Sequence, residues 1–174
     1  MSQPEKGSLP EKGSLHVIGP EEGVSFWQPE PSRGYATVKL SPENAPYNHF
    51  SSGIQVLEPG ASVSEHGHER AVEMLFVYRG RGHAKLDGER HEIEEGSLLM
   101  LGRYRLHEVV NDGDTQMKIL WVIFPPGLEH WFEAIGKPRQ PGDLPPEPFA
   151  RPDDVAEIQK AQRFVNPTAS RAAE

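Results

Sequence analysis

The chain has no cysteine among its 174 residues. This absence bears on the cellular compartment that we expect and on the atoms that can bind a metal. Without cysteine there is no disulfide framework of the kind that supports small secreted proteins. Any metal must be bound through nitrogen and oxygen, which favours Fe(II), Mn(II), Ni(II), Co(II) or Zn(II) over metals held by thiolates. We therefore expect a cytoplasmic protein.

Long apolar runs and basic segments are also missing. No stretch approaches the ~20 apolar residues of a membrane span, and the opening Met-Ser-Gln-Pro-Glu-Lys-Gly lacks the apolar segment of a signal peptide. Lysine and arginine number 18 against 26 aspartates and glutamates, which gives a formal net charge of −8. We expect neither nucleic acid nor a membrane surface as a partner.

Short strand-like segments dominate the middle of the chain. The sequence predicts strands at residues 35–40, 54–57, 73–78, 83–86, 90–93, 97–101, 106–110 and 117–124. The segments 73–78 and 83–86 are expected to form a hairpin around Gly80, and Asp87-Gly88 is expected to form the next turn. Prolines on both sides favour an edge position for 35–40. Many short strands with frequent turns indicate an all-β sandwich or barrel.

The two ends differ from this middle part. Residues 4–9 and 10–15 both read Pro-Glu-Lys-Gly-Ser-Leu, and this polar duplication predicts a disordered tail over residues 1–15. Residues 16–136 are expected to form the barrel, including N-terminal strands and a first C-terminal helix at 128–135. Residues 137–174 are expected to form a Pro-rich linker and a second helix at 153–164.

Three histidines and one glutamate have the spacing of a metal site. His66 and His68 are two residues apart, so on a strand both imidazoles point to the same face. Glu73 follows after a turn, and His107 lies far enough along the chain to come from another strand of a barrel. Together they form an N₃O ligand set that can leave coordination positions open for water, O₂ or substrate.

These residues resemble the two sequence motifs of the cupin superfamily. The first motif is matched by Gly60, His66, His68, Glu73 and Gly80, and the second by Gly96, His107 and Asn111. In the second motif, Gly102 replaces the family's proline and Tyr104 replaces its second glycine. The resemblance covers roughly residues 50–125. It implies a double-stranded β-helix, the cupin jelly-roll barrel, followed by one or two C-terminal α-helices.

The resemblance implies a metal-dependent enzyme with one divalent ion per chain, for which Fe(II) is favoured. The interpretation that leads is a mononuclear non-haem Fe(II) dioxygenase acting on a small aromatic or carbonyl compound. A Mn-, Zn- or Ni-dependent isomerase, lyase or decarboxylase is the alternative, as is a non-catalytic cupin that binds a small ligand. The resemblance alone does not choose between these functions.

Two further expectations concern the substrate and the assembly. If the strand at His107 is regular, Arg105 shares its face and would bind a substrate carboxylate beside the metal, as a catalytic residue with His107 and Glu73. The resemblance also implies a homodimer, with residues 35–40 and 53–57 as candidates for sheet extension between subunits.

Overall fold

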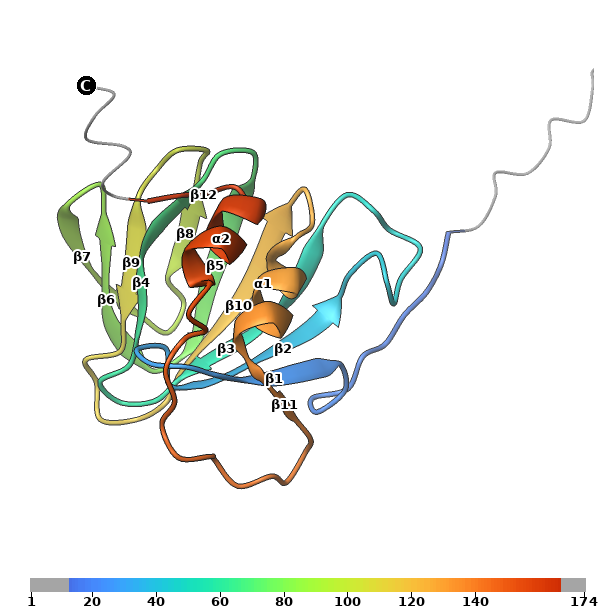
Figure 1. The fold of residues 1–174 in the computed structure, drawn as a ribbon, viewed down its shortest axis with the longest axis horizontal. Coiled ribbons are helices and arrows are strands. Elements are labelled where there is room, and N and C mark those ends of the chain that lie inside the picture. The colour runs from blue at the N-terminus through green and yellow to red at the C-terminus, as the bar shows by residue number, and fades with distance from the viewer. Residues whose placement is uncertain (1–12, 167–174) are drawn as a thin grey trace, which may run out of the picture.

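The computed structural model describes residues 13–166, and strands make up most of this part of the chain (Figure 1). In chain order the elements are β1 (Val24–Gln28), β2 (Gly34–Leu40), β3 (Ser51–Leu57), β4 (Ser62–His68), β5 (Val72–Arg79), β6 (Arg81–Leu86), β7 (Glu89–Glu94), β8 (Leu98–Leu101), β9 (His107–Val110), β10 (Met117–Phe124), α1 (Leu128–Ile135), β11 (Lys137–Arg139), α2 (Val155–Ala161) and β12 (Phe164–Val165). The expected disordered tail over residues 1–15 lies almost wholly outside the described residues.

Two antiparallel sheets form the barrel. The larger sheet has the strand order β11-β1-β2-β3-β10-β5-β8, and the smaller has the order β12-β4-β9-β6-β7. Alternate residues of β10 point inward, so Met117, Ile119, Trp121 and Ile123 are buried between the sheets. This is the predicted double-stranded β-helix with C-terminal helices.

The expected hairpin of β5 and β6 is wrong. β5 pairs with β10 and β8 in the larger sheet, whereas β6 pairs with β7 and β9 in the smaller one. The chain therefore crosses between sheets at Gly80, which has a φ of +85°. A Cβ at this position would lie 2.7 Å from the Gln116 carbonyl oxygen, so the crossing needs glycine.

The edge position expected for residues 35–40 is also wrong. β2 lies between β1 and β3, and β3 lies between β2 and β10, so both strands are paired on both sides. The neighbouring prolines do not oppose this pairing, because they occupy the loops and leave the amides of β2 free to pair. Neither β2 nor β3 can therefore extend a sheet between subunits, so residues 35–40 and 53–57 do not form a dimer contact of that kind.

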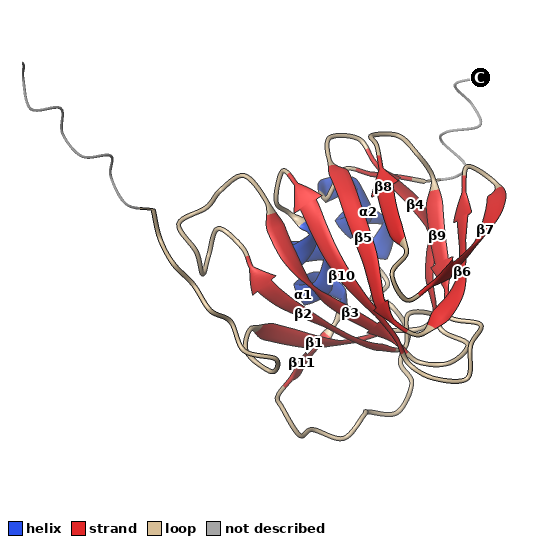
Figure 2. Ribbon diagram, turned by 180° about the vertical axis from the view of Figure 1, so that it is seen from behind, coloured by secondary structure: helices blue, strands red, loops and turns tan. Residues whose placement is uncertain are grey.

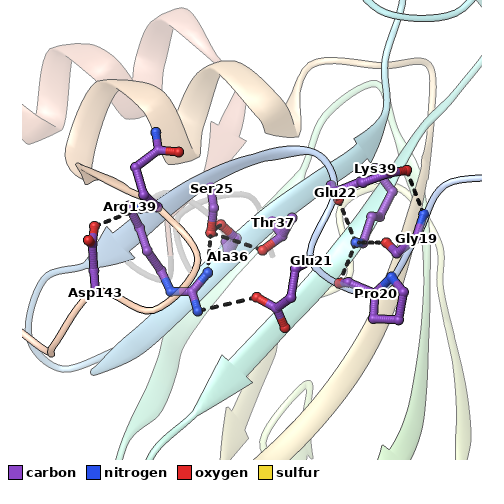
Figure 3. Close-up of polar contacts among 11 residues, drawn as sticks. Gly19, Pro20, Glu21, Glu22, Ser25, Ala36, Thr37, Lys39, Arg139 and Asp143 are labelled. Atoms are coloured by element: carbon purple, nitrogen blue, oxygen red, sulfur yellow. Dashed lines mark hydrogen bonds and ion pairs between the residues drawn. The ribbon is translucent and has the colours of Figure 1, made fainter.

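Arg139 and Lys39 make polar contacts at the edge of the larger sheet that is formed by β11, β1 and β2 (Figure 3). The Arg139 guanidinium lies 3.9 Å from the centre of the Tyr35 ring and 3.6 Å from a Glu21 carboxylate oxygen. It also donates a 3.4 Å hydrogen bond to Ser25 Oγ. The Lys39 ammonium group donates to the carbonyl oxygens of residues 19, 20 and 22. Arg139 thus anchors β11, and Lys39 anchors the loop that precedes β1.

Both helices lie on one side of the larger sheet, as the two opposite views show (Figures 1 and 2). α1 has the predicted bounds and packs on the barrel through Phe132, whose ring centre lies 5.4 Å from that of Trp121. α2 is shorter than predicted, because Arg163 has a left-handed φ of +57° and the chain then pairs with β4 as β12. Over residues 13–166, neither helix has the length and apolarity needed to cross a membrane.

Candidate metal centre

The four predicted ligands lie close together between the two sheets of the barrel. His66 and His68 lie on β4, and His107 pairs directly with His66 from the neighbouring strand β9. Glu73 faces them from β5 of the opposite sheet. One potential ligand atom from each residue can be chosen so that all four lie within 4.8 Å of one another. The four residues come from strands of both sheets and form a single cluster only because the two sheets pack face to face.

Backbone carbonyl groups orient two of the imidazoles. His66 Nδ1 lies 2.9 Å from the Ser64 carbonyl oxygen, and His107 Nδ1 lies 3.3 Å from that of Arg105. A carbonyl oxygen only accepts, so each Nδ1 carries the proton and donates it. Each Nε2 is then the unprotonated nitrogen and has a lone pair available for a metal.

The charge states in the cluster also suit a metal ion. Burial raises the pKa of the Glu73 carboxyl, but the close imidazoles of His107 and His68 outweigh it and hold that pKa well below its usual range. Burial lowers the pKa of His66 well below its usual value, and the neighbouring His107 and His68 lower it further. Glu73 is therefore ionised and His66 neutral near pH 7, which are the forms that bind metal.

The distances within the cluster fit a metal ion better than a set of hydrogen bonds. Glu73 Oε2 lies 3.2 Å from both His68 Nε2 and His107 Nε2. Ligands that sit ~2.1 Å from one ion at right angles are ~3 Å apart. His107 Nε2 is buried without a well-aligned hydrogen bond, although the Glu73 oxygen is close. A bound divalent ion would satisfy this nitrogen.

A narrow cavity, partly open to solvent, leads to His66, Glu73 and His107. Most of its wall is apolar, formed on the barrel side by Val63, Leu75, Val109 and Ile119 and on the helical side by Leu128, Trp131, Phe132 and Phe164. The Phe164 ring lies 5.2 Å from the His66 ring and 5.0 Å from that of His68. The C-terminal segment thus covers the cluster and shields it from water.

Arg105 does not line the cavity, so its predicted position beside the metal is wrong. Its side chain is 69% exposed and its Nε lies 2.6 Å from an Asp87 carboxylate oxygen. β9 begins only at His107, after Tyr104 with a left-handed φ of +64°. The alternation used to place Arg105 therefore does not apply. Tyr104 stands where the second cupin motif has a glycine, and it adopts the left-handed conformation that glycine favours.

Several cavity residues were not predicted from the sequence. Arg151 lines the cavity from the segment before α2 and donates a 3.1 Å hydrogen bond to Ser64 Oγ. Gln28 on β1, Gln55 on β3 and Gln159 on α2 add polar groups to the lining. No local pattern marks these residues, because each reaches the cavity through tertiary packing of segments far apart in the sequence.

The fold and the cluster together define a small β-barrel protein with a three-histidine, one-glutamate metal site. The family model described as "Cupin domain" matches residues 53–123, a span that contains all four clustered residues. This chain belongs to the cupin superfamily.

Similar proteins come from several microbes. The chain is 28% identical to the protein SchB of Streptomyces halstedii over 114 residues, which are 62% of this chain and 83% of SchB. It is 29% identical to the polyketide synthase CurC of Streptomyces cyaneus over 108 residues, which are 58% of this chain and 70% of CurC. A crystal structure described as a predicted oxalate decarboxylase from Thermotoga maritima superposes with a TM-score of 0.52 at 24% identity, covering 63% of this chain and 99% of that one. This structural likeness supports the fold alone.

Proposed function

We propose that this protein is a metal-dependent cupin enzyme, a mononuclear non-haem Fe(II) dioxygenase acting on a small aromatic or carbonyl compound. The observation that carries the proposal is the N₃O cluster at the end of a largely apolar cavity. A bound Fe(II) ion would supply open coordination positions for O₂ and for a chelating substrate.

The residues around the cluster have separable roles in this proposal. His66, His68, His107 and Glu73 would hold the metal ion, and the carbonyl groups of Ser64 and Arg105 orient two of the imidazoles. The apolar wall, including Leu75 and Ile119, suits an aromatic or short carbonyl compound better than a polyhydroxylated sugar. Phe164 and Trp131, whose ring centres are 5.0 Å apart, exclude water from the mouth.

The names of the relatives agree with this substrate class. CurC is described as a polyketide synthase, and polyketides are built from carbonyl units that often become aromatic. A ligand with adjacent hydroxyl or keto oxygens could chelate a metal while its carbon skeleton contacts the apolar wall. This support concerns the type of substrate and not the reaction.

Metal analysis and oxygen uptake test the proposal together. Protein purified without oxygen is expected to contain about one iron per chain and to consume O₂ with at least one member of a panel of phenols, diketones and hydroxyketones. Iron-loaded protein that consumes no O₂, while Mn- or Zn-loaded protein isomerises or cleaves a substrate, would favour the isomerase, lyase or decarboxylase function. Ligand binding without turnover under any metal would favour a binding protein.

We also propose that the protein is a homodimer, formed through the outer face of the larger sheet. On β8, Leu98 and Met100 are 61% and 70% exposed, and on β10 Phe124 is 43% exposed. Met74 and Phe76 lie between them on β5, and both helices lie on the other side of this sheet (Figure 2). A contiguous apolar face of this kind suits a second copy of the same sheet, packed about a two-fold axis.

A charge placed on this face should separate the subunits. We expect light scattering to give twice the 19.4 kDa chain mass for the natural protein and the single mass for Leu98→Glu/Met100→Glu. Leu144→Glu is the control, because Leu144 is 87% exposed on the loop after β11, the strand at the opposite end of this sheet from β8. A natural protein that remains monomeric at high micromolar concentration would contradict the proposal.

A further inference from the structure

The cavity contains one basic side chain, Arg151, that forms no ion pair with the described part of the chain. Arg151 lines the cavity, and its Nη2 donates to the uncharged Ser64 hydroxyl at 3.1 Å. Its Nε is buried without a hydrogen-bond partner. Within residues 13–166, no carboxylate oxygen lies within 4 Å of this guanidinium. Burial lowers the pKa of Arg151, so the charged form pays a desolvation cost in this position, although arginine stays protonated at neutral pH.

The segment that carries Arg151 is held in place on both sides. The Phe149 carbonyl oxygen accepts a 2.9 Å hydrogen bond from the Glu30 amide, and the Lys137 ammonium lies 4.1 Å from the centre of the Phe149 ring. On the other side, α2 begins at Val155. The Arg151 guanidinium carbon lies 5.9 Å from the Trp131 ring centre. Arg151 is therefore positioned by the fold, and within residues 13–166 its charge has no carboxylate partner.

We propose that Arg151 binds a carboxylate group of the ligand whose other end reaches the metal site, an inference that rests on the proposed metal-dependent function. Ser64, which Arg151 contacts, precedes His66 by two residues on β4. Ser64 and His66 are separated by only one residue, in an irregular part of β4, so the carboxylate would lie within several ångströms of the metal-binding end. The walls between these points are largely apolar. The ligand thus has a chelating end, a short apolar body and a carboxylate.

Charge balance supports the same ligand class. Glu73 is the only acidic residue and Arg151 the only arginine or lysine among the residues that line this cavity. A divalent ion, one glutamate and one guanidinium leave two net positive charges in a largely apolar space, which an anionic ligand would balance. A single planar guanidinium matches a carboxylate through two parallel hydrogen bonds.

A pair of ligands that differ by one charge tests the role of Arg151. Co(II)-loaded protein is titrated with protocatechuate (a dihydroxybenzoate) and with its neutral amide, and binding is followed by calorimetry and by the visible Co(II) spectrum. We expect the natural protein to prefer the carboxylate by at least about tenfold, as for a charge-assisted hydrogen bond in a partly buried site. Arg151→Gln should lose this preference and keep its affinity for the amide, and Arg151→Lys should keep part of the preference.

Arg90→Gln is the matched control, because Arg90 is half-exposed on β7, is paired with Glu92 and Asp112, and does not line the cavity. It should keep the full preference for the carboxylate. Equal affinity of the natural protein for both ligands would overturn the inference, as would no binding of protocatechuate at millimolar concentration. If Arg151 only supports Trp131 and Ser64, Arg151→Gln would weaken both ligands by the same factor, which also overturns it. Absence of bound Co(II) in the natural protein would instead contradict the proposed metal-dependent function itself.

Discussion

Replacing His107 with alanine is expected to reduce the metal content from about one ion per chain to near zero and to abolish O₂ consumption. The imidazole comes from β9 and supplies one of three nitrogen ligands, so the variant keeps only His66, His68 and Glu73. The barrel should stay folded, because its core is formed by apolar residues of both sheets rather than by the cluster. Loss of one ligand should therefore lower the metal affinity while the protein stays folded.

Thermal unfolding provides a readout that does not depend on turnover. Metal at a hundredfold excess over its dissociation constant stabilises the native state by about 2.7 kcal/mol. For a domain of this size, that free energy raises the melting temperature by roughly 5–10 °C. His107→Ala should show no such rise, whereas His91→Ala, whose half-exposed imidazole lies on β7 away from the cluster, should behave like the natural protein. A metal-dependent rise that persists in His107→Ala would contradict the four-ligand site.

Most of the strands and the common face of His66 and His68 could be predicted from the sequence because they depend on local patterns, and the resemblance to the cupin motifs added Glu73 and His107. The spacing of His66 and His68 fixes their common face, and turn residues such as Asp87 and Gly88 separate the strands. α1 was predicted with its observed bounds, because the apolar residues around Trp131 recur at helical spacing and Gly136 follows them. Such features need no knowledge of distant contacts.

The pairing of the strands and the far side of the cavity could not be predicted in this way. An alternating pattern indicates a strand without indicating its neighbour, so β5 and β6 were expected to pair although Gly80 carries the chain to the other sheet. Arg105 was misplaced because the left-handed conformation of Tyr104 interrupts the alternation before His107. Arg151 contacts Ser64 across 87 positions of sequence, a distance over which no local pattern is informative.

Asn111 is the motif residue for which we expect the largest effect on stability. Its side chain is fully buried and makes three hydrogen bonds. Nδ2 donates to the carbonyl oxygens of Leu57 at 2.8 Å and Thr115 at 2.9 Å, and Oδ1 accepts from the Gly113 amide at 3.1 Å. The second motif thus contains one residue for the metal cluster and one that joins the β9–β10 turn to the end of β3.

Asn111→Ala should lower the free energy of unfolding by about 3–5 kcal/mol, because it leaves buried carbonyl and amide groups without partners. The melting temperature should fall by roughly 6–20 °C, while metal stoichiometry is retained below the transition. Asn44→Ala is the matched control, since Asn44 also bonds to the backbone, through Lys39 and Ser41, but is exposed. We expect its loss to stay below about 1 kcal/mol.

Asn111→Asp separates the effect of hydrogen bonding from that of side-chain volume. Its carboxylate would face the carbonyl oxygens of Leu57 and Thr115, which repel a negative charge, so burial and repulsion should raise the aspartate pKa in the folded state. A group whose folded-state pKa is raised stabilises the protein at low pH and loses that contribution as the pH rises through the folded-state pKa. Relative to the natural protein, Asn111→Asp should therefore become less stable between about pH 4 and pH 7, whereas the deficit of Asn111→Ala should not depend on pH. Urea unfolding at both pH values measures the difference, and an equal pH dependence of the two variants would show that the buried polar contacts of Asn111 do not control the stability of this turn.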